Sequence, residues 1–341
     1  GFGRCGDLPR TAPPQPDEVA MRMRLPAPIW FCLGIVVALL ATNLCMTVSG
    51  PTYIARDLHR GAPISAMISA AVRSAQKRPR VVASLTTFPI GQRMGGVAQM
   101  LESLANQSWP LDAVIMNFPD RIARLSNEEI QIPAIVDIWR DQYSWLVVRQ
   151  TKDHGPATKL LGALEEEKDP DTIIIVLDDD SFYHKDTVLT LVSSMLAAPT
   201  DVAPCFMCEE VYHGWLGKAK WRYQEAEGIC NGFASGFAAY AVRPRFFDQT
   251  VWDHSKGPSG CKLHDDVWIS GCMLAATGVR PLLLRPGFFS VSGSYINQLG
   301  TRQKESVFVA NRAAHEKGLD PQSDCVAHFP FEVIDPARPI L

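Results

Sequence analysis

The stretch IIIVLDDD, residues 173–180, decides the fold that we expect for this chain. Its five apolar residues, four of them β-branched, predict a strand that is buried on both faces, as in parallel sheets. The three carboxylates follow at the C-terminal end of that strand, where open α/β sheets bind their ligands. Like charges placed together repel one another unless a cation compensates them. The triplet therefore predicts a site for Mg²⁺ or Mn²⁺ and for the phosphates of a nucleotide, with a solvated acidic turn as the alternative.

Strand and helix patterns alternate on both sides of this stretch. The expected strands are residues 80–85, 113–118, 145–149 and 173–177, and the expected helices are residues 94–104, 157–166 and 187–196. In the first helix, Met100, Leu101 and Leu104 share one apolar face. Such alternation predicts an α/β domain with a mostly parallel, Rossmann-like sheet flanked by helices, which we place at residues 80–341.

The N-terminal part of the chain has a different composition. No charged side chain lies between Arg24 and Arg56, and residues 29–48 are apolar and long enough to cross a bilayer. Residues 1–28 are then a leader or cytosolic segment, and residues 49–79 are a stem. Arg22 and Arg24 precede the apolar run, so a single-pass type II protein of the Golgi or endoplasmic reticulum, with a lumenal catalytic domain, is expected. A buried helix and a cleaved signal peptide are the alternatives.

Charge and cysteine content agree with that expectation. The net charge of -3 and the absence of a basic, aromatic-rich stripe argue against nucleic-acid binding. Six cysteines follow the apolar run, and an oxidising lumen could pair them in 15 ways, among which the sequence does not choose. They are Cys205, Cys208, Cys230, Cys261, Cys272 and Cys325.

Three further clusters carry polar groups that are suited to a nucleotide and an acceptor. At the end of the first strand, Thr86 and Thr87 offer hydroxyls to a base or ribose, or form an ordinary turn. In DHGPATK, residues 153–159, Gly-Pro opens a helix whose free amides and Lys159 favour a phosphate, or simply cap the helix. In HDDVWIS, residues 264–270, Asp265 and Asp266 stand at an expected helix start, where one serves the helix dipole and the other a general base.

The order of these motifs resembles that of GT-A-type glycosyltransferases of the family-2-like kind. The resemblance covers residues 80–285 and rests on SLTTFP, ESLANQSWP, AVIMNFPD, HGPATKLLGAL, IIIVLDDDSFY, CNGFASGFAAYAVRPRFFD and CKLHDDVWISGCML. It implies a GT-A fold and the transfer of a sugar from a nucleoside-diphosphate sugar to a hydroxyl of a glycan, protein or lipid.

The resemblance also implies roles for individual residues. The acidic triplet corresponds to the DXD motif, which makes Asp178 and Asp180 metal ligands and makes Asp178 and Asp179 nucleotide contacts. Asp at all three places leaves open which pair binds the metal. Asp266, or failing that Asp265, is the expected base of an inverting reaction. The expected acceptor contacts are Gly232, Ser235, Gly236 and Trp268.

Two other functions compete with this interpretation. A haloacid-dehalogenase-like phosphatase also has a hydrophobic strand that ends in Asp-x-Asp. Its pattern, however, has Thr or Val at the position of Phe182, and its motif lies near the start of the domain, whereas here about a hundred domain residues precede the triplet. A membrane-tethered glycan-binding domain without catalysis requires the acidic clusters to be inert. Slow hydrolysis of a nucleotide sugar without acceptor distinguishes the transferase from both.

Overall fold

The computed structural model describes residues 78–89, 93–122, 128–198, 200–214, 218–284, 294–295 and 320–334, with the backbone alone at 294–295. The expected leader 1–28, membrane span 29–48 and all but the last two residues of the stem 49–79 lie outside the described residues. Within the described ranges, no helix has the length and apolar character that a membrane crossing requires. The anchor and the orientation in the membrane therefore stay predictions.

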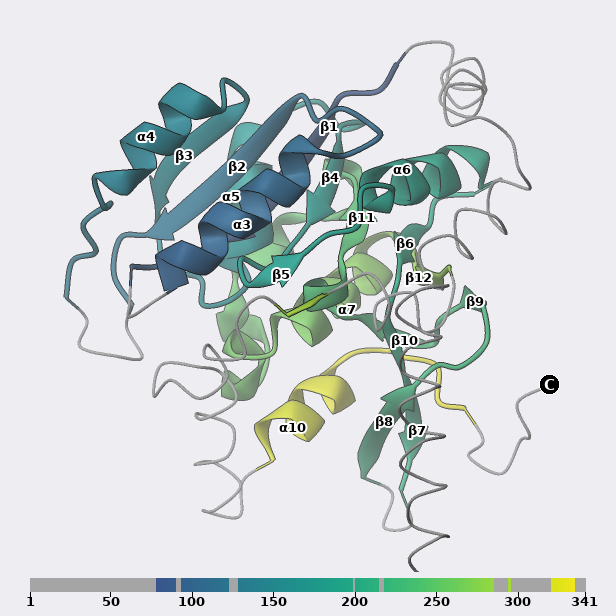
Figure 1. Ribbon diagram of the computed structural model, residues 1–341. Coiled ribbons are helices and arrows are strands. Elements are labelled where there is room, and N and C mark those ends of the chain that lie inside the picture. Colours follow the sequence, from purple (N-terminus) through teal and green to yellow (C-terminus); the bar gives the residue numbers. More distant parts are fainter. Residues whose placement is uncertain are drawn as a thin grey trace, which may run out of the picture. The chain divides into compact units, whose positions relative to one another are not determined.

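Four parallel strands form the first half of an eight-stranded central sheet (Figure 1). They are β1 (Val81–Thr86), β2 (Ala113–Pro119), β3 (Leu146–Thr151) and β4 (Ile173–Val176), in the order β3-β2-β1-β4. Every residue of β2 and β4 is buried, as the apolar runs predict for strands covered on both faces. The strands begin and end within two residues of the predicted limits, and the mostly parallel α/β sheet is confirmed.

The second half of the sheet is mixed. Strand β11 (Tyr240–Val242) lies antiparallel between β4 and β6 (Ala203–Cys205), β12 (Pro281–Leu283) is parallel to β6, and β9 (Gly228–Ile229) closes the edge. These short strands have no alternating pattern of their own, so the sequence did not indicate them. Strand β11 matters for the site because it extends the sheet directly beside the strand that carries the acidic triplet.

Helices cover this sheet close to where the sequence placed them. Helix α3 spans Arg93–Ala105, α5 spans Thr158–Glu166 and α6 spans Thr187–Ala197. Met100, Leu101 and Leu104 are all buried, which confirms the apolar face of α3. Helix α4 (Ile135–Gln142) was not predicted, because only Val136 and Trp139 face the core in its eight residues.

The remaining elements lie outside the central sheet. A three-stranded antiparallel sheet contains β7 (Cys208–His213), β8 (Ala219–Tyr223) and β10 (Gly232–Ala234), and β5 (Ser181–Phe182) pairs with β13 (Ser294–Tyr295). Helices α7 (Asp265–Thr277) and α10 (Pro321–His328) complete the described part. Short 3₁₀ helices lie between β10 and α7 in the chain: η1 (Gly236–Ala238), η2 (Pro244–Phe246), η3 (Gln249–Trp252), η4 (His254–Lys256) and η5 (Ser259–Lys262).

Two disulfides hold these peripheral elements. Cys208 pairs with Cys230, and Cys261 pairs with Cys325, while Cys205 and Cys272 are free and buried. The second disulfide joins η5 to α10 and so fixes the segment that leads into α7. Four of the six cysteines are thus paired, and the two that remain pack in the core as small apolar side chains.

Candidate active site

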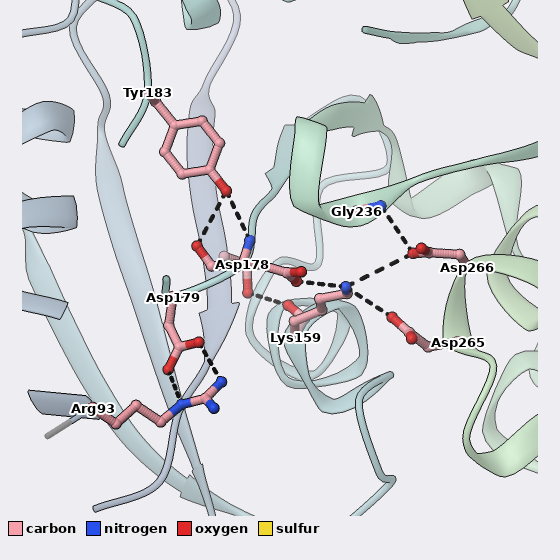
Figure 2. A network of polar contacts seen from close by, with 9 residues as sticks. Arg93, Lys159, Asp178, Asp179, Tyr183, Gly236, Asp265 and Asp266 are labelled. Atoms are coloured by element: carbon pink, nitrogen blue, oxygen red, sulfur yellow. Dashed lines mark hydrogen bonds and ion pairs between the residues drawn. The ribbon is translucent and has the colours of Figure 1, made fainter. Parts of the chain in front are cut away.

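A buried lysine joins the two acidic motifs of the chain (Figure 2). Lys159 lies in the first turn of α5, and its Nζ is 2.7 Å from Asp178 Oδ1, 2.9 Å from Asp265 Oδ2 and 3.8 Å from Asp266 Oδ1. The lysine side chain is only 5 % exposed. Burial lowers the pKa of Lys159, but Asp178, Asp265 and Asp266 outweigh it and hold that pKa well above the usual value. The ammonium therefore stays charged and compensates carboxylates from two distant parts of the sequence.

This contact changes the role expected of Lys159. The sequence suggested that its ammonium would meet a phosphate, but the structure places it among three carboxylates. An ammonium has three donors, and close opposite charges are what stabilises such a group inside a protein. Gly236 is required by the same cluster, because a Cβ at this position would collide with Lys159 Nζ and approach Asp266 Oδ1.

The acidic pair Asp265 and Asp266 opens helix α7, as the sequence predicted, but neither residue caps it. The N-cap position is His264, and no side chain there makes a capping hydrogen bond. Both carboxylates lie in the first turn, where the helix dipole favours acidic residues, and the Asp265 carboxylate also faces Lys159. Asp266 Oδ1 accepts a hydrogen bond from the Gly236 backbone N–H at 3.0 Å. Burial and then Asp265 raise the pKa of Asp266 well above its usual value, against the opposing effect of Lys159.

The middle carboxylate of the triplet has a partner of its own. Asp179 is 1 % exposed and accepts two hydrogen bonds from the guanidinium of Arg93, one of them at 2.6 Å from Nε. Arg93 also lies over the ring of Phe88, 4.5 Å from its centroid. A bidentate, buried ion pair thus occupies both oxygens of Asp179, and its contact with a nucleotide stays a prediction. No sequence signal links Arg93 to a residue 86 positions away.

Asp178 and Asp180, the outer carboxylates of the triplet, are the candidates to bind a cation. The Tyr183 hydroxyl donates to the Asp178 carbonyl at 3.1 Å and accepts from the Asp178 N–H at 2.9 Å, which fixes the backbone of the triplet. Asp178 is 32 % exposed at its side chain, and one of its oxygens meets Lys159. Among the described residues Asp180 has no ion-pair partner. Burial, Asp179 and Asp178 raise the pKa of Asp180 to about 7.

These two residues fit a divalent ion in the chemistry of their donors. No group of three or more His, Cys, Asp or Glu side chains converges as a metal site in the part of the chain that the structure describes. Mg²⁺ is usually held by one or two carboxylates and completes its coordination with waters and substrate phosphates. The uncompensated carboxylate of Asp180 is the kind of group that such a cation neutralises. Asp178 and Asp180 are therefore the residues that would hold it.

The threonines at the end of β1 lie at the same edge of the sheet as the triplet, because β1 and β4 are parallel neighbours with Ser84 opposite Val176. Thr86 Oγ1 donates to the Asn117 carbonyl at 3.1 Å. Thr87 is fully buried, and its Oγ1 has no hydrogen-bond partner among the described residues. Their contact with a nucleotide stays a prediction.

The residues expected at the acceptor have different structural roles. At Gly232, a Cβ would collide with the backbone carbonyl of Glu209 on the neighbouring strand, so glycine serves strand packing there. Trp268 is fully buried, donates from Nε1 to the Val251 carbonyl at 2.9 Å and stacks on His254 with centroids 4.6 Å apart. The prediction that Trp268 contacts the acceptor is therefore wrong, because its ring belongs to the core. Ser235 is also buried, and Gly236 is next to Asp266.

Glu209 is a titratable residue near this site that the sequence did not single out. Its Oε1 accepts a hydrogen bond from Ser235 Oγ at 3.3 Å, one residue before the Gly236 amide that binds Asp266. Burial raises the pKa of Glu209 to about 7, although the bond from Ser235 opposes the shift. Its sequence context, a Glu pair after a cysteine, has no pattern that distinguishes it from a surface pair.

We expect the raised pKa of Glu209 to make stability depend on pH. A carboxyl whose folded-state pKa is raised costs nothing below its unfolded value and destabilises the fold as pH rises toward 7. Glu209→Gln should therefore raise the free energy of unfolding at pH 8 by up to about 3 kcal/mol, and by much less at pH 4.5. Urea unfolding at both pH values measures this. Gln at the exposed Glu225 is the control, and an equal gain at both pH values would contradict the assignment.

Comparison with known proteins finds distant structural similarities. No protein-family model and no curated protein matches the sequence. Among solved structures, GalNAc-T7 with UDP, GalNAc and Mn²⁺ matches 60 % of this chain at a TM-score of 0.40 and 10 % identity, and Staphylococcus aureus TarS 1–349 matches 61 % at 0.38 and 15 %. The matched parts are 42 % and 59 % of those two chains, so this chain spans less than two thirds of their length.

The third similarity is to a protein with a different reaction. A 4-diphosphocytidyl-2C-methyl-D-erythritol synthase from Anaerococcus prevotii matches 72 % of this chain and 99 % of its own, with a TM-score of 0.37 and 10 % identity. TM-scores of 0.40 or less do not establish a shared function. The functional assignment depends on the arrangement of the site.

Proposed function

We propose that this chain is a glycosyltransferase that moves a sugar from a nucleoside-diphosphate sugar to a hydroxyl of a glycan, protein or lipid, with Mn²⁺ or Mg²⁺. The observation that carries the proposal is the contact of Lys159 with both Asp178 and Asp265. It brings the acidic triplet at the end of β4 together with the acidic pair that opens α7. Sugar transfer needs both kinds of group in one place: carboxylates toward the diphosphate and a base toward the acceptor.

In this proposal Asp266 is the base. Its carboxylate takes the proton of the acceptor hydroxyl while that oxygen forms a bond to the anomeric carbon. The bond from the anomeric carbon to the diphosphate breaks, and its electron pair leaves with the diphosphate. The Gly236 amide and Lys159 hold the base in place. A raised pKa makes Asp266 a stronger base once it is ionised, and the charge of Lys159 favours the ionised form. Attack from the side opposite to the leaving group inverts the anomeric centre.

In this proposal the acidic triplet faces the diphosphate leaving group. Asp178 and Asp180 would hold a divalent ion, which when bound would stabilise the charge of the departing diphosphate. Asp179 and Arg93 neutralise each other and fix the loop, so they position the outer carboxylates. Thr86 and Thr87, at the adjacent strand end, are proposed to contact the nucleoside.

We place this activity in residues 80–341 of a type II membrane protein with the catalytic domain in the lumen of the Golgi or endoplasmic reticulum. The disulfides Cys208–Cys230 and Cys261–Cys325 support an oxidising compartment. In sealed microsomes, added protease should leave the catalytic domain intact until detergent is present. Its digestion without detergent would contradict this orientation.

A screen of nucleotide sugars tests the function. The full chain should release nucleoside diphosphate slowly from one UDP- or GDP-sugar without acceptor, and chelation by EDTA should lower the rate at least about tenfold until Mn²⁺ is restored. Asn at the exposed Asp141 on α4 is a control that should match the wild-type rate. No release from any donor, together with release of phosphate from small phosphate esters, would favour a phosphatase. Glycan binding without any hydrolysis would favour a binding domain.

A further inference from the structure

A cavity of 460 Å³ lies between the segments that lead into α5 and α7. Its walls are residues 152–154, residues 252–255 with Gly257, and the η5 residues Ser259 and Lys262. The first wall is tied to the active site because the His154 N–H donates to Thr158 Oγ1 at 3.0 Å, next to Lys159. The third wall ends three residues before Asp265, at most about 11 Å along the chain. The cavity therefore borders both halves of the proposed site.

The walls of this cavity are fixed in place. Gly155 has φ of 66° and lies so close to the Lys262 carbonyl that a Cβ would collide with it, so the first and third walls meet backbone to backbone. The disulfide of Cys261 with Cys325 holds the third wall to α10. His254, in the second wall, stacks on the core residue Trp268. A cavity with such supports is a formed site rather than a gap between mobile loops.

The charged groups that line the cavity are two lysines and two aspartates, and they differ in what they contact. Lys152 and Lys262 are exposed, and neither has an ion-pair partner among the described residues. By contrast, the Asp153 carboxylate accepts from the Gly155 N–H at 2.8 Å, and the Asp253 carboxylate accepts from the Ser255 N–H at 3.1 Å. The two carboxylates keep their charges, but one oxygen of each is directed to a backbone N–H. The two ammonium groups are therefore the charged groups of the lining that can turn toward an anionic ligand.

The uncharged groups of the cavity suit a sugar ring. His154 lies edge-on to Trp252, with ring centroids 5.9 Å apart. Burial, followed by His154 and Lys262, lowers the pKa of His254 to about 4, so this imidazole is neutral at physiological pH. The buried Nε2 of His254 has no hydrogen-bond partner among the described residues. Aromatic rings with polar edges and neutral hydrogen-bonding groups are what a saccharide contacts.

We infer that this cavity binds an acidic saccharide, a sugar unit with a carboxylate, as part of the acceptor. The lysines meet the carboxylate, and Trp252 with the two imidazoles meets the ring and its hydroxyls. This inference rests on the proposed function in one respect, since it takes the bound saccharide to be the acceptor of the transfer. The binding itself does not require that any transfer occurs.

Calorimetric titration of the full chain tests the inference with two disaccharides that differ only in their terminal unit, glucuronic acid or glucose. The acidic disaccharide should bind at least tenfold more tightly. Lys262→Glu should weaken that binding at least tenfold and leave the neutral disaccharide unaffected, and Lys152→Glu should act in the same direction. Lys220→Glu, at an exposed lysine of β8 outside the cavity, is the matched control and should bind like the wild type. Equal affinity for both disaccharides, or no effect of either cavity variant, would overturn the inference.

Two further measurements distinguish this inference from a simple anion site and from the proposed transferase activity. Inorganic sulfate should bind much more weakly than the acidic disaccharide; equal affinity would show an anion site without a sugar and would overturn the inference. Release of nucleoside diphosphate without acceptor should be the same in Lys262→Glu as in the wild type. If no donor is hydrolysed but the acidic disaccharide binds as expected, the proposed transferase fails and the saccharide site stands. If a donor is hydrolysed but the acidic disaccharide is not bound selectively, the saccharide site fails and the proposed transferase stands.

Discussion

Asp266→Asn should lower the rate of sugar transfer by about 10² to 10⁴-fold, because an amide cannot take the proton of the acceptor hydroxyl. The fold should survive the change. The Asn oxygen can still accept the hydrogen bond from Gly236, and removal of one carboxylate relieves repulsion with Asp265. We therefore expect the affinity for the donor and the melting temperature to stay near their wild-type values. Rates at saturating donor and acceptor, with a calorimetric melt of the same samples, measure this.

The neighbouring residue provides the matched comparison. Asp265 lies 2.9 Å from Lys159 and does not contact the Gly236 amide, so Asp265→Asn should lower stability more than it lowers the rate. In the wild type the rate should rise with pH as Asp266 loses its proton, and this rise should be absent in Asp266→Asn. Transfer at close to the wild-type rate in Asp266→Asn would show that the base lies elsewhere or that the reaction retains configuration.

The strand that carries the acidic triplet and the start of helix α7 could be predicted because residues adjacent in sequence determine both. The apolar run before Asp178 is continuous and β-branched, so its strand was evident, and the carboxylates had to follow at the strand end. Helix α7 begins at Asp265, where acidic residues favour a helix start. In each case neighbouring residues determine the backbone.

The partners of those residues depend on tertiary contacts and could not be predicted in the same way. Lys159 was noticed as a cation near a helix start, but its three carboxylates come from β4 and α7. Arg93 reaches Asp179 across 86 positions, and the insertion of β11 beside β4 has no periodic signal. Trp268 was placed at the acceptor although it is fully buried, because one face of a helix cannot be assigned to core or cleft from spacing alone.

Lys159→Met should be the most destabilising single change in the site. Methionine keeps much of the apolar stem but removes the charge that faces Asp178, Asp265 and Asp266. Removing one partner of a buried ion pair leaves the other charge uncompensated, which costs about 3–5 kcal/mol. We expect a loss of that size in the free energy of unfolding at pH 7.5, measured by urea denaturation. Met at the exposed Lys168, just after α5, is the control and should change little.

The dependence of this loss on pH identifies its cause. Because the folded-state pKa of Lys159 is raised, its stabilising charge is present throughout the neutral range and is lost only at strongly alkaline pH. In Lys159→Met the three carboxylates can be relieved only by taking up protons. The deficit relative to the wild type should therefore shrink as pH falls from 7.5 toward 4. A deficit that is the same at both pH values would mean that Lys159 stabilises the fold through packing, and that the two acidic motifs do not depend on its charge.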